Sequence, residues 1–351
     1  MTRVKKVSQR GLVAVVIMLP LILAFYSHAD ALPRIVPIPC GGDIDQIING
    51  DDRDTPSRFV LAANCSNPFV ASATIVPSNG DEVACAVAPT FVQRGRAAQD
   101  PTTKCTVAGS ASVENVFRPI GKGGTTATVR FEGIKITGGN YTGSSGSGAG
   151  IAEGSMTDSS YHYGIEVMNN DAAGILSAKG TFDRVEFTNN TLVSGALGVI
   201  GAAIKARNEV EVKNSYVHDT QGNGLWCDNE CADANTANGK FWIHDNLVVN
   251  AGRGGIRWEG VSLGEALIQY NEIYGNSYDA SRGGVSIRDA KDAEVKNNTF
   301  GSNANRVAII ASASGKSGRP PLRNIDIWGN NLNGEIIKGC ELPDDVVDCT
   351  P

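Results

Sequence analysis

Apolar side chains recur along the chain in short alternating segments. Eight segments each centre on an apolar residue and carry another apolar residue two positions earlier, with 20 to 32 residues between successive centres. Alternation with a period of two is typical of a strand with one buried face, and recurrence at this length is typical of a solenoid. We expect the eight centres to stack in one interior column: Ile136, Val167, Phe187, Val212, Ile243, Ile268, Val295 and Ile327.

Asparagine marks the position three residues after most of these centres. Asn tolerates the left-handed backbone that a sharp corner needs, and its amide can hydrogen-bond to the equivalent residue one coil away. The pattern therefore predicts a corner with an asparagine ladder. A second short strand, usually introduced by Gly, follows in most repeats, as in Gly224-Leu225 and Gly255-Ile256. The corner positions are Gly139, Asn170, Asn190, Ser215, Asn246, Asn271, Asn298 and Asn330.

This order of short strand, Asn corner, second strand and Gly-rich turn resembles the right-handed parallel β-helix repeat proteins. That superfamily includes pectate lyases, polygalacturonases and uronan epimerases, and the resemblance covers roughly residues 110 to 340. It implies an all-β fold, a right-handed parallel β-helix solenoid with an N-terminal cap. A β-propeller fits less well, because each blade needs four strands in about 40 to 45 residues.

The first 31 residues have the features of a signal peptide. Four basic residues precede an apolar run over residues 11–25, and Ala29-Asp30-Ala31 has the small-x-small form of a cleavage site. The run is shorter than the roughly 20 residues that span a membrane, although an uncleaved anchor is the alternative. No later stretch is long and apolar enough to span. We expect a secreted, extracellular protein.

The remaining chain divides into a cap and a solenoid. Residues 32–110 are expected to form an N-terminal cap and the first irregular coils, with a short amphipathic helix over residues 43–48 and a strand over residues 59–62. Capping protects the open strand edges at the end of a solenoid. Residues 111–351 are expected to form the β-helix repeats, with a disulfide closing the C-terminal end.

All eight cysteines follow the predicted signal peptide, and an even count in that context indicates disulfides. Proximity in the sequence favours pairing Cys40 with Cys65, Cys85 with Cys105, Cys227 with Cys231, and Cys340 with Cys349. A cysteine metal site is the alternative. It lacks a second Cys or His pair at a distance that matches Cys227 and Cys231.

The second strands of the repeats carry bulky and ionisable residues at outward positions. One outward column contains Lys205, Trp226 and Arg257, and a parallel column contains Arg207, Asp228, Glu259 and Arg288. Coils about 4.8 Å apart would bring these side chains together. Trp offers a flat apolar area and Arg a forked carboxylate grip, as a polysaccharide site requires. The alternative is a solvated ladder of ion pairs that keeps the coils in register.

We assign candidate roles on the first interpretation. Asp228, Glu259 and Arg257 are the predicted catalytic residues, and Trp226, Lys205, Arg207 and Arg288 are the predicted substrate contacts. Two neighbouring carboxylates suit a glycoside hydrolase, whereas cations beside a uronate carboxylate suit a lyase or epimerase. The expected function is binding or processing of an extracellular polysaccharide, and the alternative is a non-catalytic secreted or cell-surface β-helix module.

Further features narrow these expectations. The segment Phe241-Trp242-Ile243-His244-Asp245 is similar to the Trp-Ile-Asp-His stretch of pectate lyases, but its His-Asp order is reversed and it fits an ordinary repeat, with Trp242 and His244 outward. His218-Asp219 is expected to stabilise a turn. The net charge of −6 and 6% aromatic content disfavour nucleic acid as a partner. No metal site or other cofactor is specified, although a Ca²⁺ ion held by turn carboxylates stays open.

Overall fold

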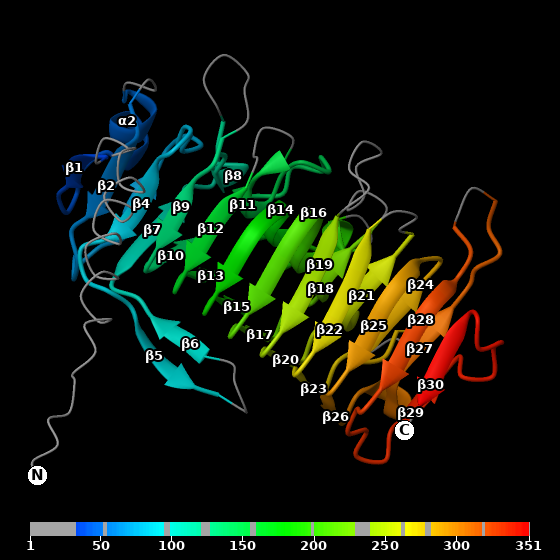
Figure 1. Cartoon of the computed structure of the whole chain (residues 1–351). Coiled ribbons are helices and arrows are strands. Elements are labelled where there is room, and N and C mark those ends of the chain that lie inside the picture. Colours follow the sequence, from blue (N-terminus) through cyan, green and yellow to red (C-terminus); the bar gives the residue numbers. More distant parts are fainter. Residues whose placement is uncertain are drawn as a thin grey trace, which may run out of the picture.

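The chain is a right-handed parallel β-helix. The computed structural model describes residues 33–51, 55–94, 99–120, 127–154, 159–197, 200–228, 239–260, 264–277, 282–317 and 320–350. Figure 1 shows an elongated stack that runs from β1 at one end to β30 at the other. Nearly every strand is paired in parallel with the strand one coil before and one coil after, so the fold class expected from the repeats is confirmed.

Each coil contributes strands to three faces of the stack. Face 1 is formed by β1 (Arg34–Ile38), β2 (Ser57–Leu61), β4 (Glu82–Cys85), β9 (Arg130–Glu132), β12 (Ser160–Tyr163), the later parts of β14 (Ala173–Asp183) and β16 (Ala202–Lys213), β19 (Lys240–His244), β22 (Glu265–Gln269), β25 (Lys291–Lys296), β28 (Arg323–Trp328) and β30 (Val347–Thr350).

Face 2 is a separate sheet of short strands. It contains β3 (Phe69–Ala71), β7 (Cys105–Gly109), β10 (Ile134–Thr137), β13 (Glu166–Met168), β15 (Glu186–Thr188), β17 (Tyr216–His218), β20 (Leu247–Val249), β23 (Glu272–Tyr274) and β26 (Thr299–Gly301).

Face 3 contains β8 (Asn115–Phe117), β11 (Ala149–Ala152), the early parts of β14 and β16, β18 (Asn223–Cys227), β21 (Gly254–Glu259), β24 (Val285–Arg288), β27 (Val307–Ser312) and β29 (Ile336–Lys338). Because β14 and β16 run from face 3 into face 1 without a break, these two faces form one sheet.

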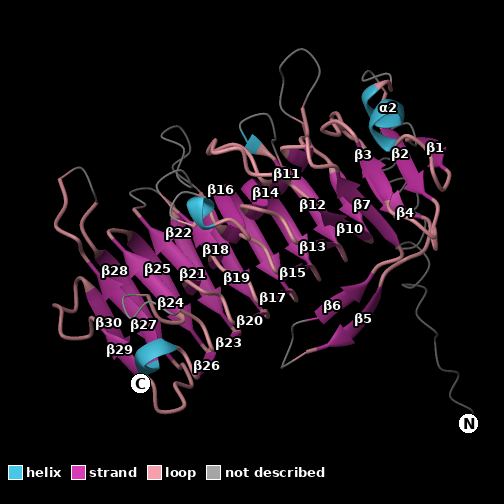
Figure 2. Cartoon of the chain, turned by 180° about the vertical axis from the view of Figure 1, so that it is seen from behind, coloured by secondary structure: helices cyan, strands magenta, loops and turns pink. Residues whose placement is uncertain are grey.

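Other elements lie outside the three faces. The antiparallel hairpin of β5 (Thr90–Gln93) and β6 (Gln99–Thr102) projects from the stack (Figure 2), and 3₁₀ turns cover Ser194–Ala196 and Ala304–Arg306. The helix α2 (Ile44–Asn49) lies at the N-terminal end, and the Asp43 carboxylate accepts a hydrogen bond from the Gln46 N–H. The expected short helix is therefore confirmed, with Ile44 and Ile48 buried.

The expected single interior column is wrong, although all eight of its residues are buried. Ile136, Val167 and Phe187 stack on face 2, where the next residue is Val217. Val212 lies on face 1, where its partners are Phe182 in the coil before and Ile243 in the coil after. The remaining predicted residues, Ile268, Val295 and Ile327, follow in the same column of face 1.

The error has a physical cause, since the inward positions of faces 1 and 2 lie five residues apart in one coil, as in Val212 and Val217. Both strands have the same alternation, so the pattern alone does not distinguish them. In addition, one inward position of face 1 is occupied by His162, between Phe131 and Phe182. Because histidine is polar, a pattern of apolar residues does not include that position.

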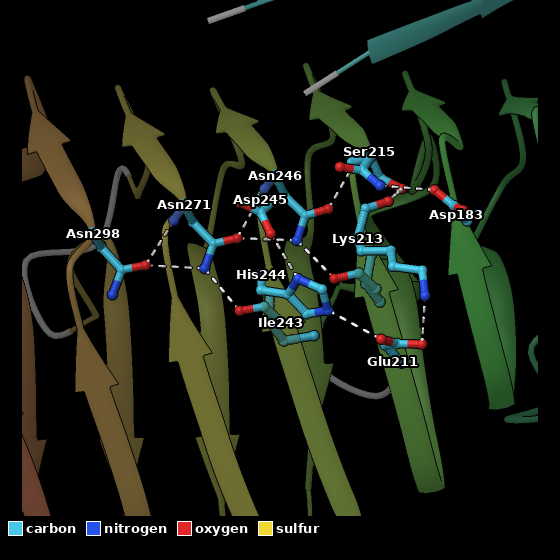
Figure 3. Close-up of polar contacts among 12 residues, drawn as sticks. Asp183, Glu211, Lys213, Ser215, Ile243, His244, Asp245, Asn246, Asn271 and Asn298 are labelled. Atoms are coloured by element: carbon cyan, nitrogen blue, oxygen red, sulfur yellow. Dashed lines mark hydrogen bonds and ion pairs between the residues drawn. The ribbon is translucent and has the colours of Figure 1, made fainter. Parts of the chain in front are cut away.

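The corner residues form two ladders for the same reason. Between faces 1 and 2, the Nδ2 of Asn246 donates to Asn271 and that of Asn271 to Asn298 (Figure 3). The ladder continues from the Nδ2 of Asn298 to Asn330. Between faces 2 and 3, a second ladder contains Asn170–Asn190 and Asn276–Asn303.

We expected the left-handed backbone at the ladder asparagines themselves. It occurs instead one residue before the ladder positions, at Asn169, Asn214 and Asn297. The turn and the inter-coil amide bonds are therefore provided by neighbouring residues.

Three of the expected disulfides are present: Cys40–Cys65, Cys85–Cys105 and Cys340–Cys349. Cys231 and residues 1–31 lie outside the described residues, so the pairing with Cys227 and the signal peptide stay predictions. In the part of the chain that the structure describes, no helix has the length and apolar character needed to cross a membrane.

Candidate functional site

The predicted outward column on face 3 exists. Lys205, Trp226 and Arg257 are direct partners on β16, β18 and β21, and Ser286 follows on β24. Glu259 is in register with Arg288, as expected. Arg207 is half-buried and follows directly after the last paired residue of this part of β16. The strand register thus brings predicted residues of four successive coils side by side.

Trp226 does not offer the open plate that the sequence suggested. The Lys205 Nζ lies 4.7 Å and the Arg257 Cζ lies 5.0 Å from the ring centroid, and these cations come from the coils on either side. Only 5% of Trp226 is exposed. Cation–π contacts therefore occupy the ring, and this arrangement leaves no free face on which a sugar could stack.

The two predicted catalytic carboxylates are paired with cations. The Asp228 Oδ2 lies 3.2 Å from the Lys205 Nζ, and Glu259 forms an ion pair with Arg257. The Arg288 Nε lies 3.8 Å from the Asp289 Oδ2. Such pairing is what the ladder interpretation expects. The catalytic roles of Asp228, Glu259 and Arg257 stay predictions.

Arg257 has an unusual environment for a guanidinium. Burial lowers its pKa, and the attraction of Glu259 opposes that effect only in part. The Arg257 Nε and the Trp226 Nε1 are both buried, and neither has a hydrogen-bond acceptor among the described residues. Perturbed groups of this kind occur in functional sites and also in structural ion pairs.

A groove of about 430 Å³ lies instead on face 1, across β19, β22, β25 and β28. These strands lie side by side in Figure 1. The groove is lined by two rows of outward side chains, four in each row, above the inward residues Phe241, Ala266 and Ala293. One row is Trp242, Leu267, Glu294 and Asp326, and the other is Lys240, Glu265, Asp292 and Asn324.

One end of the groove is aromatic and apolar. Trp242 is 40% exposed and is in register with the half-buried Leu267 on the next strand. The Lys240 Nζ lies 5.9 Å from the Trp242 ring centroid and 3.5 Å from a Glu265 carboxylate oxygen. Unlike Trp226, Trp242 has ring surface open to solvent.

The other end of the groove is acidic. Glu294 is bonded to the Lys296 Nζ at 2.8 Å and to the Trp328 Nε1 at 2.9 Å. Partial burial raises the pKa of Glu294, but these two hydrogen bonds outweigh it and the net pKa is lowered. Asp326, the next residue in the row, is exposed and makes no hydrogen bond or ion pair with the described residues.

Beside the groove, a histidine cluster joins two coils (Figure 3). The His244 Nε2 lies 3.1 Å from Glu211 and its Nδ1 lies 2.8 Å from Asp245, while Glu211 also contacts the Lys213 Nζ at 3.0 Å. Partial burial raises the pKa of Glu211, but bonds from His244 and Lys213 outweigh it and lower the net value. Because both ring nitrogens face carboxylates, His244 has no free nitrogen for a substrate.

The same arrangement occurs on face 2. The His218 Nε2 lies 2.9 Å from Glu186, and its Nδ1 lies 2.8 Å from Asp219. The role expected for His218-Asp219, a turn-stabilising hydrogen bond, is confirmed. Each histidine thus contacts the aspartate that follows it at the corner of its own coil, and a glutamate in the coil before.

Sequence reasoning missed the groove, although it placed Trp242 on the outside. The required signal was present, because the alternation that turns Phe241 and Ile243 inward also turns Trp242, Leu267, Glu294 and Asp326 outward. The predicted outward columns belong to the second strands of the repeats, which form face 3, whereas the groove lies on face 1. Within the described residues, no group of three or more His, Cys, Asp or Glu side chains is arranged to hold a metal ion.

Comparison with known proteins supports the fold. The A-module of the mannuronan C-5 epimerase AlgE4 from Azotobacter vinelandii matches with a TM-score of 0.50 and 11% identity, covering 88% of this chain and 95% of the module. The Dettilon tailspike protein matches with a TM-score of 0.43 and 17% identity over 80% of this chain. This chain spans only about half, 54%, of the tailspike chain.

No protein-family model matches the chain, and no curated protein matches it. At the identities above, a structural likeness shows the fold and not the activity. The likeness to the epimerase module therefore supports the parallel β-helix fold and nothing beyond the fold.

Proposed function

We propose that this protein is an extracellular glycan-binding β-helix, and that its glycan lies in the groove on face 1. The observation that carries this proposal is the exposed ring of Trp242 at one end of a groove that crosses four coils. An aromatic ring supplies a rigid apolar surface that packs against a sugar ring, and neighbouring carboxylates accept hydrogen bonds from hydroxyl groups. Strands about 4.8 Å apart give the four coils a span of about 14 Å, which favours an extended ligand.

Binding is favoured over processing at this groove. Glycan hydrolysis by acid and base uses two carboxyl groups that reach the substrate. Lysines pair with three of the four carboxylates of the groove, and Asp326 alone has no partner among the described residues. Secretion is part of the proposal, since the three disulfides fit an oxidising compartment.

A glycan array tests this function. The protein without residues 1–31 is applied to neutral, acidic and amino-bearing polysaccharides, and retained protein is measured. We expect retention on at least one of them and loss of that retention in Trp242→Ala. Tyr270→Ala is the matched control, because Tyr270 is a similarly exposed aromatic residue, at 42%, but does not line the groove. Retention that is unchanged in Trp242→Ala would refute the site.

Processing at face 3 is a second candidate function, favoured by the lowered pKa of Arg257 and by its buried Nε, which has no acceptor in the described part of the chain. A lyase, epimerase or hydrolase reaction would there use Asp228, Glu259 and Arg257. The test is release of unsaturated product or reducing ends from uronans and neutral glycans. Asp228→Asn and Glu259→Gln should abolish turnover and spare retention. If the wild-type protein releases no product from a glycan that it retains, this candidate is rejected.

A further inference from the structure

The groove on face 1 has a polarity along the solenoid axis, and this inference rests on the function proposed above. In the row closest to the corner, the side chains change from aromatic to aliphatic to acidic in successive coils: Trp242, Leu267, Glu294 and Asp326. Direct register partners stand about 4.8 Å apart. The acidic end therefore begins about 10 Å from Trp242, within reach of one extended ligand.

The charge of the lining is unbalanced. Four of its residues are carboxylates, and Lys240 is the one cation among the eleven lining residues. Lysines pair with three of the four, since Lys240 contacts Glu265, Lys291 contacts Asp292 at 3.3 Å, and Lys296 contacts Glu294. The fourth carboxylate, Asp326, has no such partner among the described residues, although it is in register with Glu294.

Two further contacts keep the acidic end in place. The Asn324 Nδ2 donates to the Asp292 Oδ1 at 2.7 Å, and the Trp328 Nε1 donates to the Glu294 Oε1 at 2.9 Å. These bonds orient Asp292 and Glu294 across neighbouring coils. Asp326, which lacks comparable bonds, can turn its carboxylate toward a ligand.

We propose that the groove recognises a glycan whose sugars carry protonated amino groups, with one sugar ring against Trp242 and Leu267 and an ammonium group at Asp326 and Glu294. An ammonium group would supply the cation that Asp326 lacks, through a charge-assisted hydrogen bond. A polyuronate would place carboxylates beside Glu294 and Asp326, where like charges repel.

The test uses one polymer in two charge states. Chitosan, which carries free amino groups, is compared with the same chitosan after full N-acetylation, and alginate serves as the polyanion. We expect the wild-type protein to be retained on chitosan more strongly than on the acetylated polymer, and more weakly as salt increases, because salt screens exposed charges. Alginate should retain it least.

Variants assign the charge effect to the groove. Asp326→Asn should weaken the apparent Kd for a chitosan oligosaccharide by about fivefold, as expected for one partly exposed charge pair, and should reduce the salt dependence. Asp345→Asn removes the same charge from an exposed position outside the groove lining and should leave the Kd unchanged. Equal losses in the two variants would overturn the proposal, because the effect would then reflect net charge.

The remaining outcomes separate this proposal from the proposed function. Equal retention on both chitosan forms, lost in Trp242→Ala and unaffected by Asp326→Asn, would overturn the amino-sugar inference and support glycan binding in the groove. Retention that is strongest on alginate would also overturn the inference. If no polysaccharide of any charge retains the protein, both proposals fall together.

Discussion

His162 and Glu153 form a buried pair inside the solenoid, with 2.9 Å between the His162 Nε2 and the Glu153 Oε1. The imidazole is stacked between Phe131 and Phe182, at centroid distances of 5.3 Å and 4.4 Å. The second Glu153 oxygen accepts the backbone N–H of Lys179 at 2.6 Å. One carboxylate thus joins an interior side chain to the next coil.

Loss of this carboxylate should destabilise the protein strongly. In Glu153→Ala, the imidazole and the Lys179 N–H both lose a buried partner, and breaking a buried pair in this way costs about 3–5 kcal/mol. Urea denaturation measures the change. The double variant Glu153→Ala/His162→Phe should recover much of the loss, because phenylalanine continues the ring stack and needs no hydrogen bond. Equal stability of the single and double variants would contradict this account.

The asparagine ladder between faces 1 and 2 should contribute measurably to stability. The Asn271 Nδ2 donates to Asn298 at 3.0 Å and to the Ile243 carbonyl at 2.9 Å, and its Oδ1 accepts from Asn246. In Asn271→Ala, the Asn246 amide, the Asn298 amide and the Ile243 carbonyl each lose one buried hydrogen bond, so we expect a loss of at least about 2 kcal/mol in the free energy of unfolding.

The control for the ladder is Asn67→Ala. Asn67 is exposed, and no hydrogen bond of its side chain is found in the described structure. Its replacement should change the free energy of unfolding by less than about 0.5 kcal/mol. A similar change in both variants would mean that the amide bonds of the ladder are replaced by water at little cost.

The interior residues were predictable and their columns were not. Alternation identifies Phe241 and Ile243 as inward residues whatever the coil geometry, because side chains on a strand alternate between faces. The assignment of Val212 to a column depends on how many residues the corner uses, and Val212 and Val217 satisfy the pattern equally. His162 made the correct register harder to find, because its burial depends on a partner, Glu153, that is nine residues away.

In the candidate site, too, some features were predictable from the sequence and others were not. Strand register was enough to place Trp226 between Lys205 and Arg257. The burial of Trp226 depends on what packs over face 3, and the alternation of a strand carries no information on that. Conversely, Trp242 was expected to be outward, but the groove beside it requires Leu267, Glu294 and Asp326 from three further coils, whose lateral arrangement follows only from the correct register.

The His218 cluster should make stability depend on pH. Burial lowers the pKa of His218, but hydrogen bonds to Glu186 and Asp219 outweigh it, and the net pKa is raised above the ordinary value. Thr188 lies 3.3 Å from the Nδ1, Tyr216 is stacked on the ring at 4.0 Å, and the carboxylate of Glu166 is close enough to interact with His218 electrostatically.

The sign of this pH effect follows from linkage. A group whose pKa is raised by folding stabilises the native state fully at pH values below its unfolded pKa, and that contribution disappears as the pH rises through the folded pKa. We therefore expect the Tm of the wild-type protein to fall from mildly acidic to alkaline pH more steeply than that of His218→Gln. Thermal unfolding at several pH values checks this, and parallel curves would show that His218 does not contribute.

The ion pair of Glu259 with Arg257 should be worth far more than an exposed pair of the same type. The two side chains are 13% and 7% exposed, whereas Glu265 and Lys240 in the groove are 63% and 47% exposed. Glu259→Gln leaves the Arg257 guanidinium buried without its counter-charge, which costs about 3–5 kcal/mol, while Glu265→Gln should cost less than about 1 kcal/mol. Urea denaturation of both variants, each an isosteric loss of one charge, measures the difference.

A large loss of stability in Glu259→Gln without any effect on glycan turnover would identify the pair as structural. A loss no greater than that of Glu265→Gln would instead show that water or another cation partner reaches Arg257, and would remove burial as the cause of its lowered pKa.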